Sequence, residues 1–364
     1  MMQKCVALLG RRDEPTDAIA EYCQYLRGAL REHDFQMEIV RAAWKEEGWA
    51  AAQRELRQQA QGWRGAWVFV QFTALAWSER GFPMRFLEVL RVLREAQARV
   101  AVVYHDVEPY SGTRLVDRLR RRAQIRTLRS IARYSNLRIF TVEPELLSWR
   151  PSHKFPLACI PVGANFPNPI LCEQGQSHAA HEPLTVAVFG ITGGAAGSSE
   201  ITRIAEAMRE VAQSIGPARL RIFGRNAQSV EACLRDALRD TAVVCEVLGV
   251  LSPGDVASAL CRSDVQLDVR GAISTRRGSA IAGVACGLPV VAHAGAETGG
   301  AILQAGLALY EPGKPGDLVR TLTRVLTDPT YRASLAARSR AAHERYFSWS
   351  AIAAKYAEEL RRIP

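Results

Sequence analysis

Residues 185–199 read TVAVFGITGGAAGSS, an apolar run that leads into a loop rich in glycine. A helical pattern over 200–214 follows, and then a second apolar run, LRIF at 220–223. Short continuous apolar runs are typical of strands that are buried on both faces of a parallel sheet. The order strand, loop, helix, strand therefore predicts a parallel α/β unit in this part of the chain.

The same alternation continues toward the C-terminus. Strands are expected at 243–248, 265–269 and 288–292, and helices at 253–261, 279–286, 315–327, 330–346 and 348–362. Gly287 is expected to end the helix at 279–286 in a left-handed conformation. This half of the chain thus contains the parts of a complete α/β domain.

The N-terminal half has the same organisation. Strands are expected at 3–9, 37–40, 66–72, 99–104 and 137–142, and helices at 18–32, 44–61 and 84–96. Residues 171–183 are polar and without periodicity, which indicates a linker. The sequence therefore predicts an α/β fold with two doubly wound domains, in which ligands bind at the carboxyl ends of the strands.

The composition is that of a globular protein. Of the 364 residues, 48 % are hydrophobic and 23 % are charged, which excludes collagen and intrinsic disorder. The apolar runs are far shorter than the roughly 18 residues of a membrane span, and the N-terminus shows no signal-peptide pattern. The eight cysteines form no CxxC pair and are interpreted as reduced thiols, so a cytoplasmic location is expected.

Positive charge is concentrated in one segment. The net charge is +10, and nine arginines with a single acid, Asp117, give the segment Arg114–Arg138 a charge of +8. Two partners fit, an anionic membrane surface at the inner face of the membrane or a polyanionic acceptor, and a solvated basic surface is the alternative. Nucleic acid is not expected as a partner, because few aromatic residues are interleaved for base stacking.

The apolar residues of this segment do not all lie on one face of a single helix. They form two groups on roughly opposite sides of a helix, the first Leu115, Val116, Leu119 and Ala123, the second Ile125, Leu128, Ile131 and Ala132. This change of phase predicts two helices, or a kink near Ala123–Gln124.

Two segments of the second half are candidates for binding a phosphate group. In the loop 190–199, Gly193 and Gly194 would let backbone N–H groups approach a phosphate at a helix N-terminus. The alternative is that these glycines only form a flexible turn. The segment 274–279 combines two arginines with hydroxyl groups before a short helix, and we expect it to clamp a diphosphate. Its candidate residues are Ser274, Thr275, Arg276, Arg277 and Ser279. The alternative is that Ser279 caps the helix and the arginines are solvated.

A third candidate follows the apolar run RVAVVY at 99–104. His105 and Asp106 stand at the end of this predicted strand, where they could position or deprotonate a hydroxyl group. The alternative is a histidine satisfied by the local backbone. No metal site is expected, because Cys172, His178 and His181 lie in the linker without a second Cys/His pair.

Several stretches together resemble the GT-B glycosyltransferases, specifically the family-four type that uses nucleotide sugars. They span most of the chain: VVYHDVEPY (102–110), IPVGANFP (160–167), VAVFGITGG (186–194), LRIFG (220–224), VLGVLSPGDVASALCRSDVQLDV (247–269), GSAIAGVACGLPVVA (278–292) and RYFSWSAIAAKYAEEL (345–360). The resemblance implies two Rossmann-like domains with a cleft between them. It assigns an acceptor-binding domain to 1–170, a linker to 171–183, a domain that binds the nucleotide sugar to 184–344, and a helix that crosses back to 345–364.

The sequence departs from this family in two respects. The family has two glutamates eight residues apart, and an ungapped match places Ser274 and Ala282 there. The usual arginine and lysine on the diphosphate are also not evident near Gly190, and Arg225 is a candidate substitute.

The resemblance implies a function. It is transfer of a sugar from a nucleotide sugar to a hydroxyl acceptor, without metal or cofactor and with retention of the anomeric configuration. A lipid-linked or polysaccharide precursor is expected as the acceptor, and the arginine segment is the indication for it. His105 and Asp106 would face the reacting groups. Two alternatives stay open: an inactive protein of this fold that binds a partner, and a nucleotide-sugar 2-epimerase.

Overall fold

The computed structural model describes residues 2–166 and 183–363, which form two compact units. The first unit comprises residues 1–161 and 349–364, and the second comprises residues 162–348. Almost all of the expected linker at 171–183 lies outside the described residues. In the described ranges, no helix is long and apolar enough to cross a bilayer.

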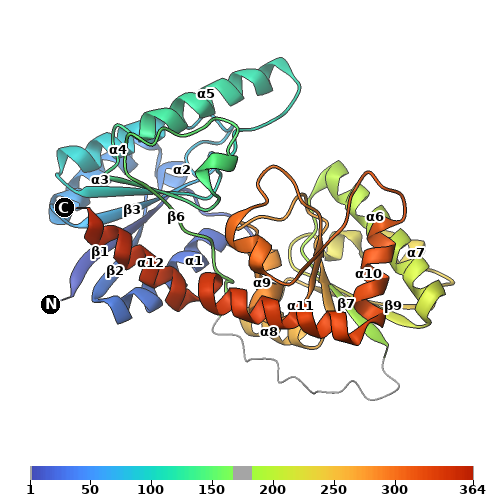
Figure 1. The fold of residues 1–364 in the computed structure, drawn as a ribbon. Helices are drawn as coiled ribbons and strands as arrows, with labels where there is room; N and C mark the ends of the chain where they lie inside the picture. Colours follow the sequence, from blue (N-terminus) through green and yellow to red (C-terminus); the bar gives the residue numbers. More distant parts are fainter. Residues whose placement is uncertain (1, 167–182, 364) are drawn as a thin grey trace. The chain divides into compact units, whose positions relative to one another are not determined.

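The first unit is built on a six-stranded parallel sheet with the order β2-β1-β3-β4-β5-β6. Its strands are β1 (Gln3–Leu9), β2 (Phe35–Arg41), β3 (Trp67–Phe72), β4 (Arg99–Tyr104), β5 (Leu137–Phe140) and β6 (Leu157–Cys159). Its helices are α1 (Ala18–Leu30), α2 (Trp44–Glu47), α3 (Trp49–Ala60), α4 (Phe86–Glu95), α5 (Leu115–Ile131) and α12 (Trp349–Arg362) (Figure 1). The strand order reverses beside β1, which is the point where open sheets of this kind bind ligands.

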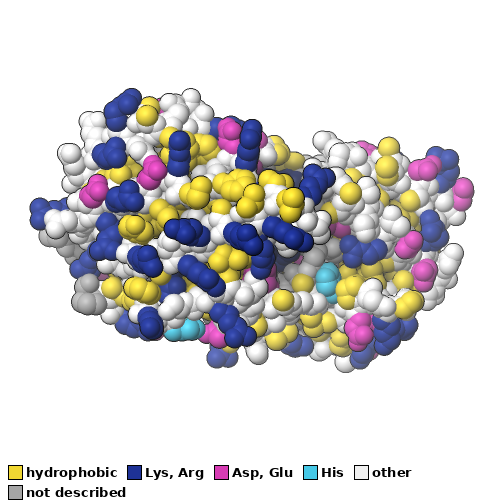
Figure 2. Space-filling view, turned by 90° about the horizontal axis from the view of Figure 1, so that it is seen from above, with side chains coloured by type: hydrophobic (Ala, Val, Ile, Leu, Met, Phe, Trp, Pro, Cys, Tyr) yellow, Lys and Arg dark blue, Asp and Glu magenta, His cyan; other side chains and the backbone are white. Residues whose placement is uncertain are grey.

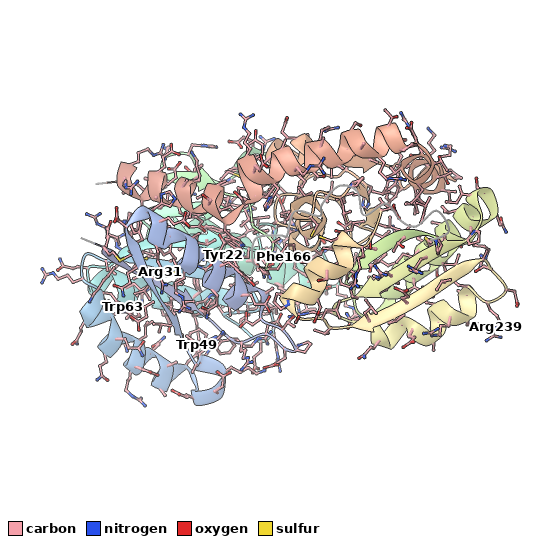
Figure 3. The ribbon with its side chains drawn as sticks, turned by 90° about the horizontal axis from the view of Figure 1, so that it is seen from below. Tyr22, Arg31, Trp49, Trp63, Phe166 and Arg239 are labelled. Carbon is pink, nitrogen blue, oxygen red and sulfur yellow. The ribbon has the colours of Figure 1, made fainter. Side chains whose placement is uncertain are left out.

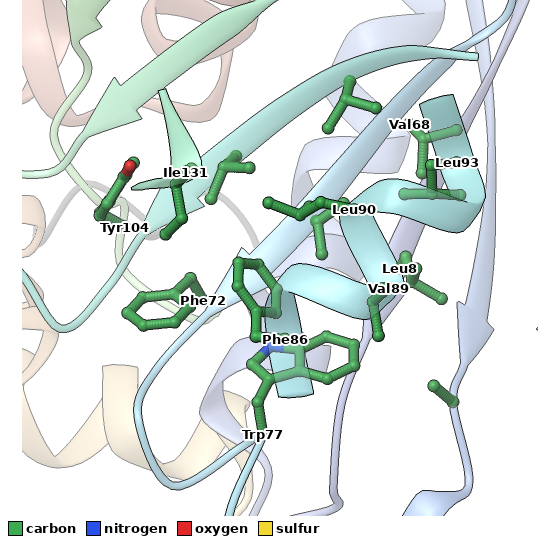
Figure 4. Close-up of a cluster of buried hydrophobic side chains, with 14 of the residues drawn as sticks. Leu8, Val68, Phe72, Trp77, Phe86, Val89, Leu90, Leu93, Tyr104 and Ile131 are labelled. Atoms are coloured by element: carbon green, nitrogen blue, oxygen red, sulfur yellow. The ribbon is translucent and has the colours of Figure 1, made fainter. Parts of the chain in front are cut away.

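The core of the first unit lies between this sheet and its helices. All residues of β3 are buried, as its unbroken apolar run predicts. In α4 the buried residues Phe86, Val89, Leu90 and Leu93 recur at helical spacing, so that one face of the helix packs on the sheet (Figure 4). This packing fixes the carboxyl ends of β3 and β4, where His105 and Asp106 follow.

The C-terminal helix α12 belongs to the core of the first unit and runs along α1 (Figure 1). The hydroxyl groups of Tyr22 and Tyr356 are 2.9 Å apart, and both side chains are buried. Trp349 stacks on Tyr25 and meets Tyr22, which is labelled in Figure 3, edge to face. Segments more than 300 residues apart in the sequence thus share one packed interface.

The second unit has a six-stranded parallel sheet with the order β12-β11-β10-β7-β8-β9. Its strands are β7 (Leu184–Phe189), β8 (Ala218–Phe223), β9 (Val243–Gly249), β10 (Val265–Leu267), β11 (Val290–Ala292) and β12 (Leu307–Leu309). Its helices are α6 (Gly194–Ile215), α7 (Glu231–Ala237), α8 (Pro253–Cys261), α9 (Gly278–Ala285), α10 (Asp317–Thr327) and α11 (Pro329–Ala342). Gly287 follows α9 with a φ of 70°, as predicted.

The prediction of a break in the arginine segment is wrong. Residues 115–131 form the single helix α5, and its buried face is made by Gln124, Thr127, Leu128 and Ile131 together with Asp117. The phase change arises because the first apolar group is not packed: Leu115, Val116 and Leu119 are exposed.

Three further expectations need correction. Arg138 is not part of a basic surface, because it is 1 % exposed in β5 and donates hydrogen bonds to the carbonyl groups of Ser152 and Phe155. The helix expected at 44–61 is interrupted by Gly48, whose φ is 80°. Cys261 is disulfide-bonded, so the interpretation of all cysteines as reduced thiols is wrong for this residue.

Candidate functional site

The loop between β7 and α6 presents backbone N–H groups at the carboxyl edge of the second sheet. Gly190 has a φ of 80° and Gly194 a φ of 67°, a left-handed conformation that glycine adopts without strain. Gly193 stands at the N-cap of α6, and no described atom lies within 4 Å of the position that a Cβ on Gly194 would occupy. The start of this 22-residue helix is therefore open to a ligand and favours negative charge.

Two arginines lie against glycine backbones next to this loop. A Cβ on Gly190 would stand 2.9 Å from Nη1 of Arg270, and a Cβ on Gly271 would stand 2.8 Å from Nη2 of Arg277. Glycine at these two positions thus makes room for the guanidinium groups. Arg277 also donates from Nε to the carbonyl of Ala272, and burial followed by the charge of Arg276 lowers its pKa.

Asp268 lies between these arginines, directly after β10. Its side chain is buried, and burial raises its pKa, an effect that Arg277 and Arg270 oppose. Its Oδ1 accepts a hydrogen bond from the backbone N–H of Arg270, whereas its Oδ2 has no hydrogen-bond partner among the described residues. The negative charge of Asp268 attracts both arginines, and the group of Asp268, Arg270 and Arg277 keeps a net positive charge.

The next two strands bring further polar groups to the same edge. His293 follows β11 and Tyr310 follows β12, with ring centroids 5.4 Å apart. His293 Nδ1 and the Tyr310 hydroxyl are buried without a hydrogen-bond partner in the described ranges. Burial and then the positive charge of Arg203, on α6, lower the pKa of His293. These unsatisfied groups are suited to a polar ligand.

The predicted residues of the segment 274–279 occupy different environments. Arg276 forms a two-point ion pair with Glu297, in which Nη2 lies 2.8 Å from Oε1, so its charge is already compensated. Ser274 and Thr275 are buried, and Ser274 Oγ has no partner among the described residues. The backbone carbonyl of Ser279 accepts a hydrogen bond from Gln266. Of this segment, Arg277 is the arginine whose charge no two-point ion pair compensates.

Arg225, predicted as a substitute for the usual phosphate ligands, follows β8 and lies beside this loop. Its backbone carbonyl accepts a hydrogen bond from the N–H of Ile191, and the adjacent Asn226 donates one to the carbonyl of Ile191. Both contacts tie the glycine-rich loop to the end of β8.

In the first unit, His105 is held as a neutral side chain. Its Nε2 lies 2.8 Å from Oε1 of Gln71, whose amide nitrogen donates to the carbonyl of Phe69. This arrangement assigns the proton of the imidazole to Nε2. Burial lowers the pKa of His105 to about 4, and the ring of Tyr22 meets it edge to face. His105 is therefore an uncharged group at neutral pH, fixed in one orientation.

Asp106 lines a cavity of about 230 Å³ at the carboxyl edge of the first sheet. Its Oδ2 accepts a hydrogen bond from the backbone N–H of Ala74. Asp13, Asp17, Arg41 and Thr73 also line the cavity, and Asp17 forms an ion pair with Arg41 at 2.8 Å. Carboxylates and hydroxyl groups around a small cavity are suited to the hydroxyl groups of a saccharide.

Sequence reasoning missed Arg203, Asp268, Arg270, His293 and Tyr310. Most of them share one signal, which is a polar side chain within three residues of the end of an apolar strand. That signal had identified His105 and Asp106 in the first half. In the described residues, no three His, Cys, Asp or Glu side chains come together as metal ligands would.

No protein-family model and no curated protein matches the sequence. Solved structures match across nearly the whole chain. HepE of Anabaena in complex with UDP-glucose has a TM-score of 0.66 at 16 % identity, covering 99 % of this chain and 99 % of that chain. A glycosyltransferase from Rickettsia africae has a TM-score of 0.71 at 9 % identity, with coverage of 100 % and 98 %.

A third match is the UDP-GlcNAc 2-epimerase from Neisseria meningitidis bound to UDP-GlcNAc, with a TM-score of 0.55 at 11 % identity and coverage of 99 % and 100 %. At these identities the matches establish the fold. The chain consists of two Rossmann-like domains and has the GT-B fold of the glycosyltransferases that it matches.

Proposed function

We propose that the protein transfers a sugar from a nucleotide sugar to a hydroxyl acceptor. The observation that carries the proposal is the position of two arginines at the carboxyl edge of the second sheet: Arg270 lies against Gly190 of the glycine-rich loop, and Arg277 lies against Gly271. This edge offers positive charge, open backbone N–H groups and unsatisfied buried polar atoms, which together suit a diphosphate and the groups attached to it.

The second unit would bind the donor. Backbone N–H groups at Gly193 and Gly194 and the guanidinium group of Arg277 would contact the diphosphate, with Arg225 beside the loop. Positive charge fixed near the leaving diphosphate would stabilise the negative charge that develops there as the glycosidic bond breaks. The matched HepE structure contains UDP-glucose, which makes UDP the first nucleotide to test.

The first unit would bind the acceptor. The cavity beside Asp106 would hold the hydroxyl group that reacts, and neutral His105 would contact the reacting groups as a hydrogen-bonding group rather than as a cation. We propose a lipid-linked or polysaccharide precursor as the acceptor class, and retention of the anomeric configuration.

Two alternatives follow from specific observations. Ser274 and Ala282, at the positions of the two family glutamates, are both buried and uncharged, which favours a protein of this fold that binds a nucleotide sugar without turnover. The match to an epimerase favours conversion of UDP-GlcNAc itself. Incubation of the protein with a nucleotide sugar and no acceptor distinguishes these two alternatives, because only an epimerase would convert the sugar under those conditions.

The first test is thermal unfolding of the full chain with UDP, GDP, ADP, TDP or CMP. A nucleotide at 100 times its Kd adds about 2.7 kcal/mol of stability, a shift of several degrees. We expect one of the diphosphates to give this shift and Arg277→Gln to reduce it to about half or less. Exposed Arg239 on the surface of the second unit (Figure 3) is the matched control, and Arg239→Gln should leave the shift unchanged. No shift with any nucleotide would refute the donor site.

A further inference from the structure

Large apolar side chains are exposed together where α5 begins. Leu115 is 77 % exposed and Leu119 is 58 % exposed, and Val116 and Tyr110 beside them are also exposed. We call these four residues the apolar patch. Three of them, Leu115, Val116 and Leu119, belong to the first apolar group that the periodicity of this segment indicated.

Two buried or half-buried side chains of α5 tie Tyr110 and the neighbouring backbone of Arg80 and Gly81 to this helix. Gln124 of α5 accepts a hydrogen bond from the backbone N–H of Tyr110 at 2.7 Å and donates one to the carbonyl of Gly81 at 2.9 Å. Arg120 donates to the carbonyl of Arg80 and lies over the ring of Tyr110. The apolar patch is therefore a preformed surface of the first unit.

Arginines continue from the apolar patch along the outer face of α5. At about 100° per residue, Leu115 and Leu119 point in the same direction as a row of exposed arginines. The members of this row are Arg118, Arg122, Arg126, Arg129 and, just beyond the helix, Arg133. The only acid of the helix, Asp117, lies on the buried face and pairs with Arg120 at 2.9 Å, so it does not offset the row.

Figure 2 shows hydrophobic side chains gathered among lysine and arginine side chains on the face that is seen from above. An apolar stripe beside a row of cations that continues it is the pattern of a helix that lies in a membrane interface. A surface for nucleic acid would instead interleave aromatic residues with the cations, and the row on α5 contains none.

We propose that the outer face of α5 binds the surface of an anionic lipid bilayer. The apolar patch inserts at the level of the headgroups, and the arginine row contacts lipid phosphates along the helix. The proposal rests on the surface of the first unit alone and does not depend on sugar transfer.

Sedimentation of the full chain with vesicles tests the proposal. We expect binding to vesicles with about 30 mol % phosphatidylglycerol, much weaker binding to phosphatidylcholine alone, and weakening as salt rises. The triple variant Arg122→Gln/Arg126→Gln/Arg129→Gln should bind about 100-fold more weakly, since each arginine near such a surface contributes about fivefold. Leu115→Ser/Leu119→Ser should also weaken binding, by about tenfold or more, through the lost insertion.

Matched variants control for charge and for exposed apolar area. Arg54→Gln/Arg57→Gln changes exposed arginines on α3, and Leu303→Ser changes an exposed leucine of the second unit, and both should bind like the unchanged protein. Thermal unfolding without vesicles checks that every variant is folded. Equal binding to neutral vesicles, no binding, or unchanged binding by the α5 variants would overturn the proposal. So would tighter binding to single-stranded DNA than to anionic vesicles at the same salt concentration.

Discussion

Arg277 is the residue on which donor binding depends most directly. It is half-buried beside Asp268, and it is the arginine of the segment 274–279 whose charge no two-point ion pair compensates. We expect Arg277→Ala to reduce nucleotide diphosphate affinity by about 1.5–3 kcal/mol, the range for a hydrogen bond to a charged group. Isothermal titration calorimetry measures this change, with Arg239→Ala as the control. An unchanged affinity would remove Arg277 from the site.

His105 should make stability depend on pH. Its pKa is lowered from 6.5 to about 4 by burial, so between these values the unfolded chain binds a proton that the folded chain does not. Its contribution to stability is complete above pH 6.5 and is lost as the pH falls toward 4, and about 2 kcal/mol should be lost between pH 7 and pH 5.

Urea unfolding at pH 7 and pH 5 measures this effect. His105→Gln should lose about 2 kcal/mol less than the unchanged protein over this interval, while His153→Gln, at an exposed position, should behave like the unchanged protein. Equal pH dependence in all three proteins would show that folding does not lower the pKa of His105.

The candidate site could be predicted in part, for a physical reason. Arg277 and the glycines were found because each lies in a segment that carries the relevant chemistry within a few residues. Arg270, His293 and Tyr310 follow three different strands, and they meet only because those strands are neighbours in the sheet. Strand order is set by packing at long range, so no local pattern connects them.

Gly197 fixes how the element α6 meets the glycine-rich loop. A Cβ at this position would fall 2.0 Å from the backbone carbonyl oxygen of Thr192, which cannot move without displacing the loop. We expect Gly197→Ala to destabilise the protein by about 1–3 kcal/mol and to weaken nucleotide binding. Thermal unfolding with and without nucleotide measures both. Gly254→Ala on α8, where a Cβ would meet nothing within 4 Å, is the control.

The elements that sequence patterns predict best are those whose burial is uniform along their length. β3 is buried at every position, and its apolar run identified it. β6 and β12, of three residues each, were not predicted, although β10 and β11 are as short and were expected at 265–269 and 288–292. α5 was divided wrongly because the periodicity argument assumes that an apolar face is packed, whereas Leu115 and Leu119 are exposed.

At the scale of the whole molecule, the chain leaves the first unit and returns to it, so the two units should respond to different perturbations. Tyr356 of α12 is fully buried against α1, and Tyr356→Ala should destabilise the first unit by about 3–5 kcal/mol. A nucleotide should act on the second unit, where the glycine-rich loop, Arg270 and Arg277 lie.

Hydrogen–deuterium exchange resolves these two responses along the chain. Tyr356→Ala should speed exchange in peptides from residues 2–161, because removal of the tyrosine opens the packing of α12 against α1. A bound nucleotide should slow exchange in peptides that contain residues 190–200 and 268–279, because a ligand protects the folded segments that it contacts. Tyr356→Phe keeps the ring and removes only the hydroxyl, so it should speed exchange much less than Tyr356→Ala. If a nucleotide slows exchange only in peptides of the first unit, the donor site does not lie at the edge of the second sheet. The cavity beside Asp106 would then be the candidate donor site.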